Sequence, residues 1–325
     1  MKKLTSILAP AAGVVLLLSA CAPTPAATPT ETVEFPEAGS NVTVVVPYSA
    51  GGTTDVTARA FTAALAEELG VNVEVLNTPG AGGQLGLTEL AGADPDGYTI
   101  GFTNIPSTIP TYVIADRGAT YTRESFEPIA ALTRTTNYMA VSASSPYETL
   151  DDLLEAAADA PGAITVGTAS EDETLGVEAA AESAGVEFNV VPYDGGPEKT
   201  TALLGGQVDA IIGGGTTIVP GVTNGDFRAL GIFGGEQDPF LPEIPTFSSL
   251  GIDLDINGFL IVSAPAGTPP EIVDIFEAAA EQAVADTTFQ TTVEASFQEP
   301  MYVGSEEIAG IWADQEALFT ERFGD

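Results

Sequence analysis

The feature of this sequence that most constrains its fold is an alternation of short β-branched runs with helical patterns. Residues 41–46, Asn-Val-Thr-Val-Val-Val, have the composition of a buried strand bounded by turn residues. A small-residue turn follows, and apolar residues at helical spacing then predict a helix from about Asp55 to Leu69. A second strand is predicted at 72–76. A strand, a turn, a helix and a strand in this order begin a parallel α/β layer.

The same alternation continues to the C-terminal end of the sequence. Strands are expected at 99–103, 164–167, 188–191, 208–212, 229–232 and 258–263, and helices at 148–158, 175–183, 199–204, from Pro269–Pro270 to Asp286, and from Ser305 onward. A chain of 325 residues is long enough for two domains of ordinary size. The pattern therefore predicts an α/β protein with two domains.

Charge and the scarcity of two residue types exclude several classes of function. The sequence has 46 acidic and 9 basic residues, a net charge of −37, whereas nucleic-acid binding requires a basic surface. It has no histidine and one cysteine, which rules out Ser-His-Asp and Cys-His catalysis and zinc sites built from those residues. We expect no cofactor and no metal. An enzyme would have to use paired carboxylates or a metal held by oxygens.

The N-terminus has the pattern of an export signal. Met1-Lys2-Lys3 precedes an apolar run at 7–19, which is too short to span a bilayer and is typical of a signal peptide over 1–20. Leu18-Ser19-Ala20-Cys21 resembles a bacterial lipobox, in which cleavage precedes a cysteine that then carries a diacylglycerol. The alternative is an ordinary signal peptide with a chance cysteine. We expect an extracytoplasmic protein anchored to the membrane through lipidated Cys21.

Two further stretches bear on organisation. Residues 21–40 are rich in Pro, Thr and Ala and are expected to form an extended tether. Residues 45–52, Val-Val-Pro-Tyr-Ser-Ala-Gly-Gly, are echoed by 190–196, Val-Val-Pro-Tyr-Asp-Gly-Gly. Ligands bind parallel sheets outside the carboxyl ends of the strands, so these two turns could face each other across a cleft. The echo is short and apolar, and coincidence is the alternative.

Residues 46–59, Val-Pro-Tyr-Ser-Ala-Gly-Gly-Thr-Thr-Asp-Val-Thr-Ala-Arg, resemble the signature of the Bug (TctC-type) extracytoplasmic solute-binding receptors, which serve tripartite tricarboxylate transporters. Further motifs follow in the family's order at 77–83, 95–99, 191–193, 204–209, 242–246 and 264–269. Each motif is weak alone, but together they extend the resemblance over about residues 41–320.

The resemblance implies a two-domain periplasmic-binding-protein fold of type II-like, Venus-flytrap architecture. One domain would comprise 41–140 plus 259–325, and the other 141–258. It further implies a monomeric, non-enzymatic protein that captures a small organic acid and delivers it to the subunits of a membrane permease. A receptor of the same fold that senses a solute and signals to a membrane partner is the alternative, and a secreted carboxylate-dependent enzyme is a third hypothesis.

The resemblance also implies a carboxylate site built largely from backbone N–H groups and water. A glycine-rich turn at a helix N-terminus presents such unpaired N–H groups to an anion. Asp55 is expected to cap amides, hold a bridging water or meet a ligand ammonium, with an ion pair to Arg59 as the alternative. The expected ligand-binding residues are Tyr48, Ala50, Gly51, Gly52, Thr53, Thr54, Asp55, Asn104 and Ser107 in the first domain and Thr168, Ala169, Ser170, Tyr193, Gly195 and Gly196 in the second.

The chain departs from the family's pattern in two places. The loop expected after Gly167 continues as Glu171-Asp172-Glu173, where the family is usually rich in serine and glycine. Three acids beside a carboxylate site would weaken anion binding unless they point outward. A neutral, zwitterionic or cationic solute therefore stays open beside the organic acid. The stretch Gly213-Gly214-Gly215 also departs from the usual pattern.

Overall fold

The computed structural model describes residues 35–193, 195–252 and 256–323. The predicted signal peptide, Cys21 and most of the expected tether lie outside the described residues. The end of that tether differs from expectation, since the Phe35 ring lies 5.3 Å from the Tyr98 ring and 5.4 Å from the Phe276 ring. An aromatic side chain buries apolar surface that Pro and Thr cannot, so residues 35–40 belong to the folded body.

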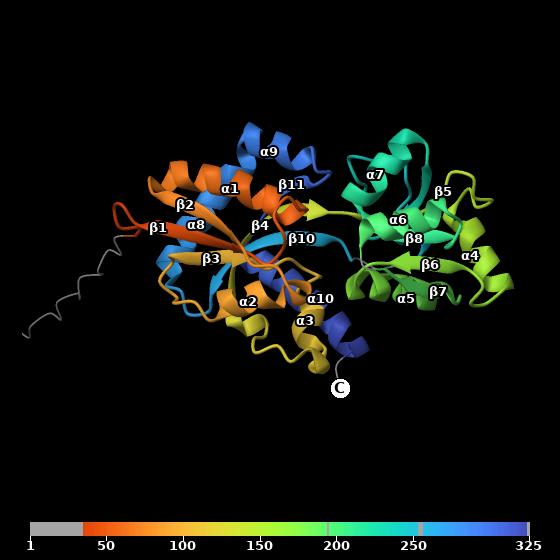
Figure 1. Ribbon diagram of the computed structural model, residues 1–325, viewed down its shortest axis with the longest axis horizontal. Coiled ribbons are helices and arrows are strands. Elements are labelled where there is room, and N and C mark those ends of the chain that lie inside the picture. The colour runs from red at the N-terminus through yellow and green to blue at the C-terminus, as the bar shows by residue number, and fades with distance from the viewer. Residues whose placement is uncertain (1–34, 194, 253–255, 324–325) are drawn as a thin grey trace, which may run out of the picture. The chain divides into compact units, whose positions relative to one another are not determined.

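Two mixed sheets organise the chain, as Figure 1 shows. The six-stranded sheet has the order β11-β4-β10-β3-β1-β2, and the five-stranded sheet has the order β7-β6-β8-β5-β9. The first sheet contains β1 (Asn41–Val46), β2 (Asn72–Asn77), β3 (Thr99–Phe102), β4 (Phe126–Thr135), β10 (Gly258–Pro265) and β11 (Glu299–Gly304). The second contains β5 (Asn137–Ser142), β6 (Thr165–Thr168), β7 (Asn189–Pro192), β8 (Ala210–Gly214) and β9 (Phe227–Ile232). We call each sheet with its helices the first and the second lobe.

Helices cover both faces of each sheet (Figure 1). In the first lobe these are α1 (Thr53–Leu69), α8 (Pro270–Ala285) and α9 (Thr287–Glu294) on one face, and α2 (Gln84–Ala91), α3 (Ile109–Val113) and α10 (Ser305–Phe323) on the other. In the second they are α4 (Leu150–Asp159) with α5 (Glu171–Ala184), and α6 (Gly196–Leu204) with α7 (Gly215–Asn224). Short 3-10 turns occur at Ala81–Gly83, Ala115–Arg117, Arg123–Ser125 and Ser248–Leu250. Within the described ranges, every helix is too short or too polar to traverse a bilayer.

The chain passes between the lobes twice. Strand β4 ends at Thr135 and β5 begins at Asn137, and the chain returns to the first sheet at Gly258. The first sheet takes its strands from residues 41–135 and 258–304, and the second from residues 137–232, while the predicted domain limits of 41–140 plus 259–325 and 141–258 stay a prediction.

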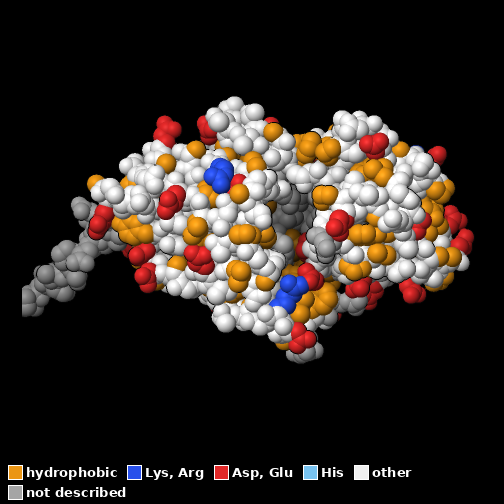
Figure 2. Space-filling view, viewed as in Figure 1, with side chains coloured by type: hydrophobic (Ala, Val, Ile, Leu, Met, Phe, Trp, Pro, Cys, Tyr) orange, Lys and Arg blue, Asp and Glu red, His pale blue; other side chains and the backbone are white. Residues whose placement is uncertain are grey.

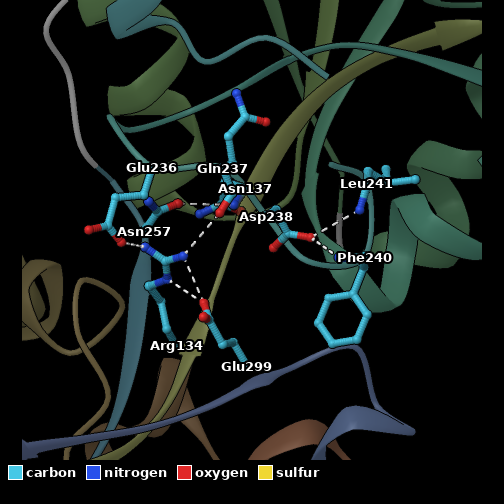
Figure 3. Close-up of polar contacts among 9 residues, drawn as sticks. All are labelled: Arg134, Asn137, Glu236, Gln237, Asp238, Phe240, Leu241, Asn257 and Glu299. Atoms are coloured by element: carbon cyan, nitrogen blue, oxygen red, sulfur yellow. Dashed lines mark hydrogen bonds and ion pairs between the residues drawn. The ribbon is translucent and has the colours of Figure 1, made fainter. Parts of the chain in front are cut away.

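Polar contacts bridge the lobes and join the two crossing segments, as the Arg134–Glu236 and Asn137–Asn257 contacts in Figure 3 show. Arg134 Nε donates to Glu299 of β11 at 2.9 Å, and its guanidinium also contacts the Glu236 carboxylate of the second lobe. Asn137 Nδ2 donates to the Ile256 carbonyl at 2.9 Å, which joins the outgoing segment to the returning one. Arg134 therefore bridges the two lobes, and Asn137 links the outgoing and returning segments.

Candidate functional site

A cavity of about 270 Å³ lies where the two lobes meet, and the surface is hollowed there in Figure 2. This volume has room for several water molecules or for one small organic solute. Its described lining combines both lobes and the crossover: Tyr48, Thr53, Thr54, Asn104, Ile105, Pro106, Ser107, Thr135, Asn137, Asp172, Gly214, Gly215, Thr216, Gly258, Leu260, Ser296, Phe297 and Gln298.

Two helices, one from each lobe, begin at the cavity wall without a side-chain cap. Helix α1 follows Gly52 (φ −79°, ψ 173°) and α7 follows Gly214 (φ −71°, ψ 173°), and no side chain of the described residues caps either end. N–H groups in the first turn of a helix have no partner within the helix and form its positive end. Since Thr53, Thr54, Gly215 and Thr216 line the cavity, both helices can offer amides to one anion.

The first-lobe residues expected at the site divide into two groups. Tyr48, Thr53, Thr54, Asn104 and Ser107 line the cavity, whereas Ala50, Gly51, Gly52 and Asp55 are not among its lining residues. The Gly51 N–H donates to Asp55 Oδ2 at 2.8 Å, so this amide is already occupied. Ligand contact by any of these residues stays a prediction.

Asp55 organises the turn that precedes α1. It is 3% exposed and accepts hydrogen bonds from Arg59 Nε at 2.9 Å and Asn77 Nδ2 at 3.0 Å, besides the Gly51 amide. Burial opposes ionisation of Asp55, but the bonds from Arg59, Gly51 and Asn77 outweigh it and lower the pKa. The expected amide cap and the alternative ion pair with Arg59 are therefore both present.

The second-lobe residues expected at the site are not among the described lining residues. Three of them surround the start of α5: the Ala169 N–H donates to Glu173 Oε2 at 2.6 Å, Ser170 Oγ accepts from the Glu173 N–H at 3.5 Å, and the Thr168 hydroxyl lies 2.9 Å from that of Thr174. Tyr193, Gly195 and Gly196 lie at the end of β7 and the start of α6. Their contact with a ligand stays a prediction.

The second-lobe turn that does line the cavity is Gly214-Gly215-Thr216. Sequence reasoning noted these glycines only as a departure from the family. The signal was available, because Gly-Gly-Thr-Thr occurs at 51–54 and again at 214–217, each time at the start of a helix that follows a strand. Residues of both copies of this repeat line the cavity, whereas the second copy of the Val-Val-Pro-Tyr echo leads to α6 and is not among the described lining residues.

Polar side chains on the first-lobe wall form a hydrogen-bonded network with two unused atoms. Asn104 Nδ2 donates to Thr54 Oγ1 at 2.7 Å, and Gln298 Oε1 accepts from the hydroxyls of Thr57 and Thr133 at 3.0 Å each. Asn104 Oδ1 and Gln298 Nε2 are buried without a partner among the described residues. Buried polar atoms in proteins are nearly always paired, so this wall offers a free acceptor and a free donor.

Replacing Thr54 with valine tests this network. The variant keeps the side-chain shape but leaves the buried Asn104 amide without its acceptor, so the free energy of unfolding should fall by about 1–3 kcal/mol in denaturant titrations. Thr62→Val on the same helix is the control, because within the described part of the chain the Thr62 hydroxyl donates to the Arg59 carbonyl of its own helix and to no other group. A Thr54→Val loss no larger than that of Thr62→Val would contradict the network.

The acidic stretch after β6 is helical, so the loop expectation was wrong. Helix α5 begins at Glu171, where the Ser170 hydroxyl caps it and carboxylates complement its positive end. Glu171 forms an ion pair with Arg117 of the first lobe, and Glu173 forms one with buried Lys199. Asp172 lies between Glu171 and Glu173 and lines the cavity. Its burial is the larger cause, and the negative charge of Glu173 the smaller cause, of a rise in the Asp172 pKa to about 6.

Comparison with known proteins shows the family to which this chain belongs. Residues 57–320 match the model of the tripartite tricarboxylate transporter family receptor, TctC. The chain belongs to this family. Among curated relatives of this receptor, a UPF0065 protein of Cupriavidus necator is 30% identical over 294 residues, covering 87% of each chain. BugT of Bordetella pertussis is 26% identical over 288 residues, 84% of this chain and 85% of that protein.

Solved structures confirm the predicted fold of this receptor. A TctC solute-binding protein from Polaromonas, without ligand, has a TM-score of 0.79 at 27% identity, covering 88% of this chain and 98% of that one. MatC from Rhodopseudomonas palustris with bound malate has a TM-score of 0.72 at 27% identity, covering 88% and 99%. R. palustris Rpa4515 with adipate has a TM-score of 0.73 at 25% identity, covering 89% and 97%.

Proposed function

We propose that this receptor is a lipid-anchored extracytoplasmic binding protein that captures a small organic carboxylate and delivers it to a tripartite tricarboxylate-type permease, without catalysing a reaction. The observation that carries the proposal is the pair of uncapped helix N-termini, α1 and α7, at one cavity. Malate and adipate, named with two similar structures, are both carboxylates. The lipobox-like sequence ending at Cys21 supports the anchor.

The position of the two helix ends explains how capture would be coupled to lobe movement. A carboxylate that accepts hydrogen bonds from the first turn of α1 and from the first turn of α7 makes both contacts only when the lobes are close. Binding energy is then available for closure, because the ligand has more contacts in the closed arrangement than in an open one. A closed receptor presents a different surface to the permease, which can thus distinguish loaded from empty protein.

Thermal unfolding with matched solutes tests this function. Short-chain carboxylates should stabilise the protein, and a bound solute at 100 times its Kd adds about 2.7 kcal/mol. The corresponding primary amides keep the size and shape but lack the negative charge, so they should give a much smaller shift. Equal stabilisation by acids and amides, or by neither, would contradict carboxylate capture at helix N-termini.

A further inference from the structure

We propose that the solute of this receptor is a small zwitterion, an amino-carboxylate whose ammonium group is bound by the carboxylate of Asp172. The inference rests on the proposed function and deepens it, because it assigns the two ends of the ligand to two ends of the same cavity. The carboxylate of the solute occupies the helix starts of α1 and α7, and its ammonium group faces the first turn of α5.

The charges at the cavity wall favour a ligand with a positive group. The described residues that line the cavity include one acid, Asp172, and no lysine or arginine. A second carboxylate on the solute would lie near Asp172 with no basic side chain to offset it. Like charges repel strongly at the effective dielectric constant of a protein surface, whereas an ammonium group would be attracted to Asp172.

The acids on either side of Asp172 each engage a basic side chain. Lys199 Nζ lies 2.5 Å from both carboxylate oxygens of Glu173, and Arg117 pairs with Glu171. Asp172 lies between these two pairs and, among the described contacts, forms no ion pair of its own. Of the three acids in this turn, Asp172 is therefore the one available to bind a cationic group of the solute.

The three helix starts at the cavity differ in the way a zwitterion requires. The starts of α1 and α7 are uncapped, while α5 carries three acids in its first turn and the Ser170 cap. One part of the wall therefore offers amide donors and the other a carboxylate. Two buried atoms without a partner among the described residues also suit the two ends of a zwitterion. Gln298, 1% exposed, has a free donor, Nε2, for a carboxylate, and Asn104, 7% exposed, has a free acceptor, Oδ1, for an ammonium group.

Calorimetric titration with matched solutes tests the assignment. Alanine, β-alanine, γ-aminobutyrate and proline carry both charges, propionate and butyrate lack the ammonium, and malonate and succinate carry a second carboxylate. At least one amino-carboxylate should bind tenfold or more tightly than its partner acids. Asp172→Asn should remove that preference. Asp151→Asn should preserve it, because Asp151 is exposed and occupies the corresponding second position of α4.

A pH series on the unmodified protein gives a second readout if Asp172→Asn fails to fold. Protonation of Asp172 removes the charge that binds the ammonium, so amino-carboxylate affinity should fall as the pH is lowered through about 6. The charged or titratable groups around Asp172 include Tyr48, Glu173 and Lys199, with the Glu171–Arg117 ion pair beside them. Glu173 and Lys199 form a mutual ion pair, and burial raises the Tyr48 pKa, so the phenol stays neutral.

The results of these experiments distinguish failure of the zwitterion assignment from failure of the proposed function. Tightest binding of malonate or succinate, affinity that rises on acidification, or a preference for ammonium that survives in Asp172→Asn would overturn the zwitterion assignment while leaving carboxylate capture intact. Failure of all three series to bind would overturn the proposed function itself.

Discussion

Replacing Lys199 with methionine should lower the free energy of unfolding by about 3–5 kcal/mol, the loss typical when one partner of a buried ion pair is removed. Lys199 is 1% exposed, and its ammonium lies within hydrogen-bonding distance of both oxygens of Glu173, which is 8% exposed. Methionine fills similar space but leaves the buried Glu173 carboxylate without its cation. Denaturant titration monitored by circular dichroism measures the loss.

The double variant Lys199→Met with Glu173→Gln is the matched control. Because it removes both charges, it should recover much of the stability that Lys199→Met loses. Glu173 also accepts a hydrogen bond from the Ala169 N–H at 2.6 Å, which holds the start of α5 in place. Because Asp172 is in this same helix turn, we expect Lys199→Met also to displace Asp172 and so to weaken ligand binding. A loss under about 1 kcal/mol in the single variant would show that the pair contributes no more than an exposed one.

Replacing Gly215 with alanine should weaken ligand binding at least tenfold, or about 1.4 kcal/mol. A Cβ atom at Gly215 would lie 2.7 Å from the Phe297 carbonyl oxygen and 2.8 Å from the Phe297 Cβ, closer than such atoms approach in proteins. Gly215 begins α7 in the second lobe, and Phe297 precedes β11 in the first. The added methyl group must push α7 away from the first lobe, and a carboxylate can then no longer reach both helix starts.

Gly310→Ala provides the control for this substitution. Gly310 lies inside α10, and a Cβ there would meet no atom within 4 Å, so alanine should raise stability by up to about 1 kcal/mol and leave affinity unchanged. Gly215→Ala should instead lower stability by about 1–3 kcal/mol through overpacking. Unchanged affinity in Gly215→Ala would mean that the approach of α7 to Phe297 is not needed for binding.

The elements that could be predicted from the sequence are those with a strong local signal. Strand β1 and helix α1 lie where the β-branched run and the apolar stripe placed them, and the glycine turn between them begins α1 at the cavity. Helix α7 was not predicted, because Gly215 at its start and Pro220 inside it disfavour helix locally. It forms through burial of Ile218 and Val219 against the second sheet, which no local pattern reveals.

The crossover and the direction of Asp172 depend on tertiary structure. Residues 126–142 form two strands in different sheets, and only Thr136 separates them, so the switch of sheet leaves no mark in the hydrophobic pattern. The α5 helix was expected from residue 175 but begins at Glu171. Each residue of a helix turns the side-chain direction by about 100°, so which of three consecutive acids faces the cavity follows only from the true helix start.

A crystal structure of the protein with a bound short-chain carboxylate, at a solute concentration well above its Kd, tests the central claim most directly. The ligand carboxylate should lie within about 3.2 Å of a first-turn backbone nitrogen of α1 and also of α7. A ligand held elsewhere, or one whose carboxylate contacts neither helix start, would contradict capture by the two opposed N-termini.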